Sequence, residues 1–139
     1  MSKFLKRSAQ GAGVPHDKRT SNLETVAMPL PSKIVLSMNQ HIGAPAAPAV
    51  AKGDQVYVGT IVGKAGGFVS ADIHSGVSGT VSEITTITGS NGSIQTAVVI
   101  VPDGEQKVDP SIAPPQVTDL KSFQDAVRAS GLVGLGGAG

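Results

Sequence analysis

The chain has 139 residues, of which 11 are Lys or Arg and 10 are Asp or Glu, so its formal net charge is only +1. This balance, with an aromatic content of 3%, argues against a nucleic-acid partner, which needs a basic patch and stacking rings. Cysteine is absent, which excludes disulfides and any iron–sulfur cluster held by cysteines of this chain. No stretch approaches the roughly 20 apolar residues of a membrane helix, so we expect a soluble, cytoplasmic chain.

The first part of the chain predicts an arm followed by a β region. Residues 1–29 are polar and lack periodicity, so we expect an extended arm. Residues 30–103 are rich in β-branched residues separated by glycine and proline, a composition typical of short strands and tight turns. The first β-type run, 34–38, follows two prolines, which favours an edge strand because proline cannot donate to a sheet ladder.

Turn signals divide the rest of the β region into short strands. Gly53, in KGDQV, indicates a turn in which glycine takes a positive φ. The run 57–65 predicts a short strand interrupted by glycines, and 68–88 predicts a pair of strands around the turn 76–79.

The strongest turn signal is GSNGS at 89–93, which lies between two β-branched runs. It contains Asn91-Gly92, the preferred pair for a two-residue hairpin turn. The returning strand is predicted over 94–101.

The last part of the chain changes in character. Residues 104–117 are rich in proline and lack periodicity, which indicates a linker. In 118–139, Ser122 followed by Asp125 resembles a capping box and Gly131 suits a helix end, so we predict one helix of roughly ten residues. A helix that leads into a glycine-rich stretch cannot form a core alone, so we expect 118–139 to begin a further, truncated domain.

Two segments of the β region share one pattern. Residues 51–63 and 74–84 each contain a glycine turn, a valine, a second glycine and a β run. Two such halves around a quasi-dyad are the hallmark of the barrel-sandwich hybrid, the fold of biotinyl and lipoyl carrier domains. We therefore predict a mostly β protein, with a barrel-sandwich hybrid over 30–103 and one short C-terminal helix.

Carrier domains of this fold modify a lysine at a hairpin tip between the two halves. The nearest lysine here is Lys64, which lacks the flanking Met of those carriers and precedes Gly66-Gly67. A carrier domain with a prosthetic group on Lys64 is therefore an alternative, and intact mass would detect the modification.

Four blocks in order carry a resemblance to a known family: GVPHDKRTS (13–21), MNQHIGAPAAPAVAKGDQVYVGTIVG (38–63), FVSADIHSGVSGTV (68–81) and SGLVGLGGAG (130–139). Together they resemble the C subunit of the Rnf electron-transport complex. The resemblance covers nearly the whole chain beyond the first dozen residues.

The resemblance implies a role in membrane electron transport. The Rnf complex moves electrons between reduced ferredoxin and NAD, coupled to movement of Na⁺ or H⁺ across the cytoplasmic membrane. Its C subunit is a peripheral protein on the inner face of that membrane, held there by partner subunits. The resemblance implies three parts for the full-length subunit: a barrel-sandwich domain, an FMN- and NADH-binding domain, and a part holding two 4Fe–4S clusters, whose cysteines this chain lacks.

The resemblance also suggests a role for the terminal glycines. Gly134, Gly136, Gly137 and Gly139 resemble the start of the family's FMN/NADH loop, where glycines let backbone N–H groups face phosphate oxygens. The family continues this loop into a Phe-Pro-Thr stretch, which would lie beyond residue 139. We therefore expect the fragment to bind neither FMN nor NADH measurably, and we assign it no catalytic residue.

Two histidines, His41 and His74, lie in the most specific stretches of the resemblance, QHIGAP (40–45) and SADIHS (70–75). Imidazole is a common metal ligand, but no third ligand is placed by spacing, so we predict no metal site. The other interpretation is that each histidine fixes a loop through hydrogen bonds to the backbone or contributes to docking.

Three functions follow from these observations. The first is a non-catalytic N-terminal domain of a redox subunit, which provides a docking or packing surface. The second is the carrier domain modified at Lys64. The third stays within the resemblance: a soluble relative that passes electrons to an amino-acid reductase without a membrane complex.

Overall fold

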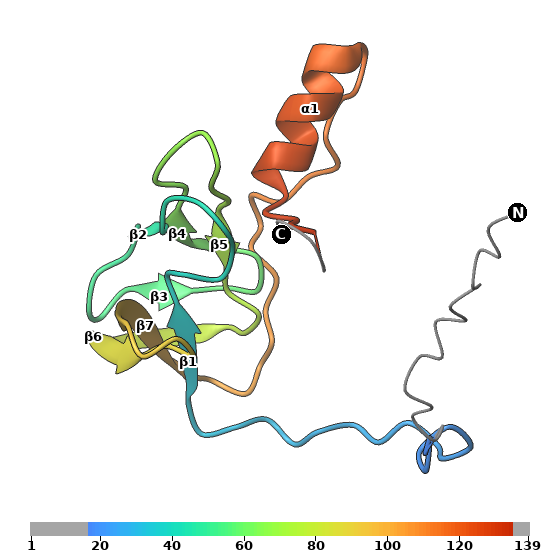
Figure 1. Cartoon of the computed structure of the whole chain (residues 1–139), viewed down its shortest axis with the longest axis vertical. Helices are drawn as coiled ribbons and strands as arrows, with labels where there is room; N and C mark the ends of the chain where they lie inside the picture. The colour runs from blue at the N-terminus through green and yellow to red at the C-terminus, as the bar shows by residue number, and fades with distance from the viewer. Residues whose placement is uncertain (1–16, 135–139) are drawn as a thin grey trace, which may run out of the picture.

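The computed structural model describes residues 17–134, and Figure 1 shows two small sheets packed together with one helix beside them. All strand pairs are antiparallel. The larger sheet has the order β1 (Ile34–Ser37), β7 (Ile94–Pro102), β6 (Gly79–Thr88) and β3 (Gln55–Val56). The smaller sheet has the order β2 (Ala47–Pro48), β4 (Ile61–Lys64) and β5 (Ile73–His74). With the helix α1 (Leu120–Ala129), the prediction of a mostly β chain with one short helix is confirmed.

Strand β7 lies between β1 and β6 in the larger sheet. Its central residues Ala97–Ile100 are all buried, because both faces of this stretch are covered. Strand β1 pairs only with β7, in the register Ile34↔Ile100, and is therefore the edge strand that the preceding prolines predict.

The β6–β7 hairpin differs from the predicted two-residue turn. The N–H of Gly89 donates to the carbonyl of Ser93 at 2.8 Å, and the N–H of Gly92 donates to the carbonyl of Gly89 at 2.9 Å. The loop therefore has three residues, of which only Gly92 has a positive φ, 78°. A two-residue type I′ turn was wrong because it needs positive φ at both central residues, and Asn91 does not adopt it.

The predicted strand pair in 68–88 was also wrong. Strands β5 and β6 belong to different sheets, since β5 pairs with β4 whereas β6 pairs with β3 and β7. The chain crosses between the sheets at 75–78, where the hydroxyl of Ser75 donates to the carbonyl of Val77 at 2.7 Å. A period-two pattern indicates strands but does not indicate which strands pair.

The run 57–65 is a strand only in its second half, β4. Gly59 has a φ of +94° and turns the chain out of β3. Its N–H donates to the carbonyl of Ser75 at 2.8 Å. Because Val56 also pairs with Gly79, the two segments of shared pattern, 51–63 and 74–84, are hydrogen bonded to each other.

Both sheets contribute to one core. It consists of Met38, Ala46, Val56, Val62, Ile73, Val77, Val81, Val98 and Ile100. Small and β-branched residues dominate, which suits the short distance between two curled sheets. Gly63 leaves room for this packing, since a Cβ there would lie 2.8 Å from Sδ of Met38.

The predicted linker, 104–117, contacts the barrel in its first half. The N–H of Val58 donates to the carbonyl of Lys107 at 2.8 Å, and the N–H of Asp109 donates to the carbonyl of Val58 at 2.9 Å. Asp109 also accepts a hydrogen bond from the hydroxyl of Thr60 at 2.6 Å. These bonds hold residues 107–109 against the turn between β3 and β4.

Helix α1 has the predicted length, but its N-cap lies earlier than expected. Asp119 is the N-cap, and its carboxylate accepts the N–H of Ser122 at 2.7 Å, while the Ser122 hydroxyl accepts the N–H of Asp119 at 2.9 Å. A capping box that starts at Ser122 was therefore wrong: Asp125 instead pairs with Lys121 one turn away. Gly131, with a φ of +70°, follows the helix in the left-handed conformation common after a C-cap.

The described part of the predicted arm, 17–29, is exposed and runs away from the barrel (Figure 1). It contains a turn in which the N–H of Ser21 donates to the carbonyl of Lys18 at 3.1 Å. In the part of the chain that the structure describes, no helix is long and apolar enough to span a membrane.

Candidate docking surface

Two loops from distant parts of the sequence form one surface at an end of the barrel. The first loop, 38–46, precedes β2, and the second, 65–72, joins β4 to β5. The N–H of Ala44 donates to the carbonyl of Val69 at 3.0 Å. The hydroxyl of Ser70 donates to the carbonyl of Ala44 at 2.8 Å. These bonds join two of the sequence blocks that carry the resemblance, 38–63 and 68–81.

Glycines allow the two loops to approach each other. Gly43 has a φ of +95°, and a Cβ at this position would overlap the carbonyl of Val69. A Cβ at Gly66 would likewise overlap the carbonyl of Pro45. The close approach therefore requires the absence of a side chain on each loop.

The ring of His41 bridges the two loops. Its Nε2 accepts the N–H of Ala71 at 3.1 Å, and its Nδ1 lies 3.1 Å from the carbonyl of Ile42. The tautomer with the proton on Nδ1 satisfies both contacts, because Nδ1 then donates and Nε2 accepts. In this arrangement His41 binds backbone groups with both ring nitrogens.

His74 lies elsewhere and does not meet His41. It is in β5, paired with Ile61, and a Cβ at Gly131 would lie 2.8 Å from its Nδ1. His74 lines a hollow beneath the C-terminal end of α1, together with Gly59 and Ile112. The structure therefore gives the two histidines different surroundings.

Lys64 is the last residue of β4 and lies at the base of the 65–72 loop rather than at its tip. Its Nζ is 2.7 Å from Oδ2 of Asp72, whose side chain is 8% exposed. The other carboxylate oxygen, Oδ1, accepts the N–H of Ala65 at 2.8 Å. Burial raises the pKa of Asp72, but these two hydrogen bonds and the Lys64 charge outweigh it and hold the pKa below its usual 3.8.

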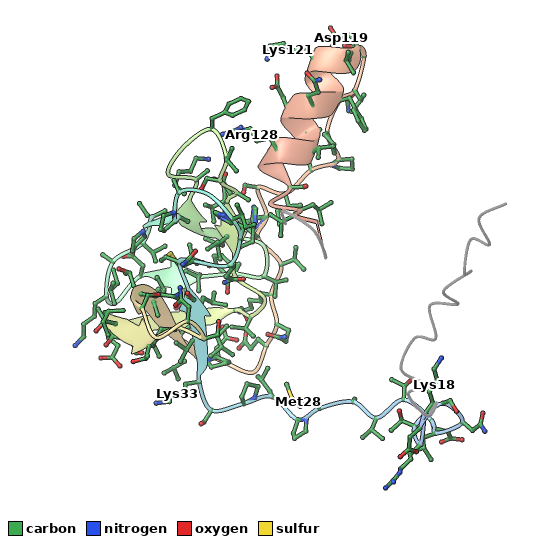
Figure 2. The ribbon with its side chains drawn as sticks, viewed as in Figure 1. Lys18, Met28, Lys33, Asp119, Lys121 and Arg128 are labelled. Carbon is green, nitrogen blue, oxygen red and sulfur yellow. The ribbon has the colours of Figure 1, made fainter. Side chains whose placement is uncertain are left out.

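Helix α1 contacts the tip of the 65–72 loop through one side chain. The guanidinium of Arg128 donates to the carbonyls of Gly67 and Phe68 at 2.9 and 3.1 Å. It also lies 5.8 Å from the centre of the Phe68 ring, within range of a cation–π interaction. Figure 2 shows Arg128 on the side of α1 that faces this loop. The sequence did not indicate this contact, because nothing in the local pattern relates residues 60 positions apart.

The two loops and α1 enclose a groove of about 460 Å³, which we call the docking groove. Its apolar lining includes Ile42, Phe68, Val69, Phe123, Val127 and Leu132. Phe68 is 90% exposed and Leu132 is 76% exposed. Apolar side chains gathered in a groove, rather than scattered singly, are typical of an interaction surface.

Of the four glycines expected in a cofactor loop, only Gly134 lies within the described residues. It is exposed and lies at the edge of the docking groove. Gly136, Gly137 and Gly139 lie outside the described residues. Over residues 17–134, no three His, Cys, Asp or Glu side chains gather as a metal ion would need.

Comparison with known families identifies the fold. Residues 6–105 match the family model described as the RnfC barrel-sandwich hybrid domain. The predicted barrel-sandwich hybrid is thereby confirmed.

Comparison with curated proteins gives relatives that share one kind of name. The chain is 40% identical, over 78% of its length, to the C subunit of the Na⁺-translocating ferredoxin:NAD⁺ oxidoreductase complex of Acetobacterium woodii. It is 34% identical, over 95% of its length, to the proton-translocating counterpart of Clostridium ljungdahlii. It is 37% identical, over 88% of its length, to the C subunit of the ion-translocating oxidoreductase complex of Rhodobacter capsulatus.

The chain spans only part of these relatives, covering 25%, 30% and 24% of their respective lengths. The family match nevertheless includes the larger part of the chain and all seven strands of the barrel. This chain therefore belongs to the family of the Rnf complex C subunit, of which it represents the N-terminal barrel-sandwich hybrid domain.

Proposed function

We propose that the chain is the N-terminal, non-catalytic domain of the peripheral subunit of a membrane-bound ferredoxin:NAD oxidoreductase coupled to ion translocation. The observation that carries the proposal is the family match over residues 6–105, together with relatives named as subunits of such complexes. The translocated ion is Na⁺ or H⁺, since relatives of both kinds match this chain.

The domain acts as a docking module through the docking groove. Phe68 and Leu132 expose apolar surface there. The two loops are joined by hydrogen bonds of His41 and Ser70, and α1 is joined to the second loop by Arg128. Loops that are already hydrogen bonded to each other favour binding, because little backbone freedom is lost when a partner covers the groove. The partner is another domain or subunit of the same complex.

The redox cofactors belong to other parts of the full-length subunit. FMN and NADH would be held by a domain whose glycine loop begins near Gly134, and two 4Fe–4S clusters by cysteines that this chain lacks. Ferredoxin and NAD are the electron-transfer partners of the whole complex. The assembly holds the subunit at the inner face of the cell membrane.

The full-length subunit in its host tests this function. Membranes from the host should reduce NAD with reduced ferredoxin and move Na⁺ or H⁺, and deletion of the barrel should release the subunit from the membranes. Phe68→Ser should weaken this association, whereas Val108→Ser, an exposed apolar position outside the groove, should not. Membranes that retain a barrel-deleted subunit at the normal level would contradict the docking role.

A separate measurement tests the carrier alternative. A biotinyl or lipoyl group on Lys64 would add its fixed mass to the protein purified from the host. The ion pair of Lys64 with Asp72 at the base of the loop disfavours this alternative, because carriers present their lysine at an exposed tip. An unmodified intact mass is the expected result. A soluble complex with an amino-acid reductase, in place of a membrane complex, would instead support the third function.

A further inference from the structure

The segment that leads into β1 is extended and exposed (Figure 1). Residues 24–30, which we call the strap, are all exposed, and Figure 2 shows Met28 on a stretch of chain that extends away from the body. Among the described residues, hydrogen bonds are present within 17–23 but none involves the strap. An extended chain with free backbone groups can pair with another strand.

Apolar side chains alternate along the strap. Val26 is 86% exposed, Met28 is 80% exposed and Leu30 is 43% exposed. Residues at i, i+2 and i+4 lie on one face of an extended strand, so these three side chains would form a single apolar row.

Prolines distinguish the two edges of the strap. In a strand, the N–H and C=O groups of alternate residues point to the same edge. Val26, Met28 and Leu30 supply one edge, on which every residue has an N–H. The other edge contains Pro29 and Pro31, which have no N–H to donate. Only the first edge has an unbroken row of donors with which to extend a sheet ladder.

We propose that the strap adds as a terminal strand to an uncovered sheet edge of another subunit of the complex. The backbone of Val26, Met28 and Leu30 pairs with that edge, and their side chains cover an apolar face of the partner's sheet. The prolines close the outer edge, so that no further strand can add. The identity of the partner as a subunit of the same complex rests on the proposed function.

Three observations favour a partner subunit over the chain's own barrel. The strap extends away from the barrel, as Figure 1 shows. The family match begins at residue 6 and so includes the strap as part of the shared domain. Relatives of this domain are named as subunits of complexes, which offer other chains to pair with.

Hydrogen exchange on the full-length subunit, alone and in the purified complex, tests the pairing. In the complex, the amides of Val26, Met28 and Leu30 should exchange at least about tenfold more slowly than in the free subunit, while those of Thr25 and Ala27 stay fast. Uniform exchange along the strap in the complex would overturn the proposal. Binding of the strap as a polyproline helix would give such a result, because that conformation does not protect alternate amides.

A pair of variants separates backbone pairing from general disturbance. Met28→Pro removes an N–H from the pairing edge and should weaken association by about tenfold or more, the loss expected for one net hydrogen bond with its side-chain contacts. Ala27→Pro, the matched control, removes an N–H from the closed edge and should leave association unchanged. Equal effects of the two variants would overturn the proposal.

The outcomes distinguish this proposal from the proposed function. If the complex reduces NAD with ferredoxin and contains the subunit, but the strap is unprotected, the strap proposal fails and the function stands. If the subunit is in no membrane complex, both fail. If the strap amides of the isolated subunit became protected from exchange as the protein concentration rose, the strap would pair with a second copy of the chain. That result would overturn pairing with a different subunit.

Discussion

At the residue scale, Gly43 determines how the loops that form the docking groove meet. Its φ is +95°, and its missing side chain leaves the space that the carbonyl of Val69 occupies. Gly53 has the same φ, but a Cβ there would have no neighbour within 4 Å. An alanine at Gly53 would therefore bear only the cost of the left-handed backbone, whereas an alanine at Gly43 would bear this cost and that of a steric overlap.

Gly43→Ala should lower the free energy of unfolding by more than Gly53→Ala does. A left-handed backbone on a non-glycine residue costs about 1 kcal/mol, which is the expected loss for Gly53→Ala. The overlap with Val69 should bring the loss for Gly43→Ala to about 2–4 kcal/mol. Urea denaturation followed by circular dichroism measures both values, and equal losses would contradict the role of Gly43 in the loop contact.

Asp72 gives a prediction about pH. Because its pKa is below 3.8 in the folded protein, the folded state holds fewer protons at this group than the unfolded state. The stability that the Asp72 carboxylate contributes is therefore fully present above the pKa of the unfolded state. It is lost as the pH falls through the lower pKa of the folded state. Asp72→Asn should remove this dependence, so the difference in stability between the wild type and the variant should shrink from about pH 6 to about pH 3.

Urea midpoints at both pH values provide the measurement. The carboxylates of Asp103, Asp109 and Asp119 also have lowered pKa values, through hydrogen bonds from Ser78, Ser111 and Ser122 respectively. They are present in both proteins, so they cancel in the difference. Lys64→Gln should weaken this pH dependence without abolishing it, because Lys64 is one of the groups that lower the pKa of Asp72 and the hydrogen bond from the N–H of Ala65 remains. A difference that does not change with pH would show that Asp72 is not ionised in a hydrogen-bonded site.

At the scale of elements, α1 is held to the barrel by polar contacts rather than by a buried face. None of its residues is buried. Its position depends on Arg128, which donates to two carbonyls of the 65–72 loop, and on Gly131, which passes close to His74. Removal of one of these contacts should release the helix without unfolding the sheets.

Arg128→Lys should increase cleavage of the 65–72 loop by chymotrypsin at Phe68. Lysine cannot donate to both carbonyls in the planar arrangement of a guanidinium, so the loop tip loses its link to α1. We expect an increase of about threefold to tenfold in the cleavage rate, which follows the loss of roughly 1 kcal/mol. Lys121→Arg, on the same helix and remote from the loop, is the control, and equal rates for all three proteins would contradict the link.

At the scale of the whole molecule, the barrel is the folding unit and the segment after it is an attachment. The core lies entirely within residues 38–100, and both sheets contribute to it. Residues 107–109 complete the barrel by pairing with Val58. The described residues beyond Ile112 add no buried side chain.

Deletion of 113–139 should therefore leave the barrel folded, with a loss of no more than about 1–2 kcal/mol for the contacts of Arg128. Deletion of 105–139 should cost more, because it also removes the bonds of residues 107–109 to Val58 and the bond of Asp109 to Thr60. Thermal unfolding of the two truncated proteins measures the difference. If the shorter deletion abolished cooperative unfolding, α1 would have to be part of the folding unit.

Much of the architecture could be read from local sequence patterns. Strand runs at 34–38 and 94–101, the turn at Gly53 and a ten-residue helix each depend on neighbours a few residues apart. For that reason they were predicted with small errors at their ends, such as the N-cap at Asp119. The conformation of the β6–β7 turn was predicted less well, because the sheet register selects among turns that Asn-Gly permits.

By itself, the sequence determined that the chain is a barrel-sandwich hybrid of the Rnf C-subunit family, because turn glycines, β-branched runs and the order of specific blocks are local or linear features. Only the tertiary structure decided which strands pair, since β5 and β6 follow each other but join different sheets. It also decided that Arg128 reaches Phe68 and that His41 binds Ala71. These contacts join residues 30 to 60 positions apart, and their geometry depends on the folded path of the whole chain.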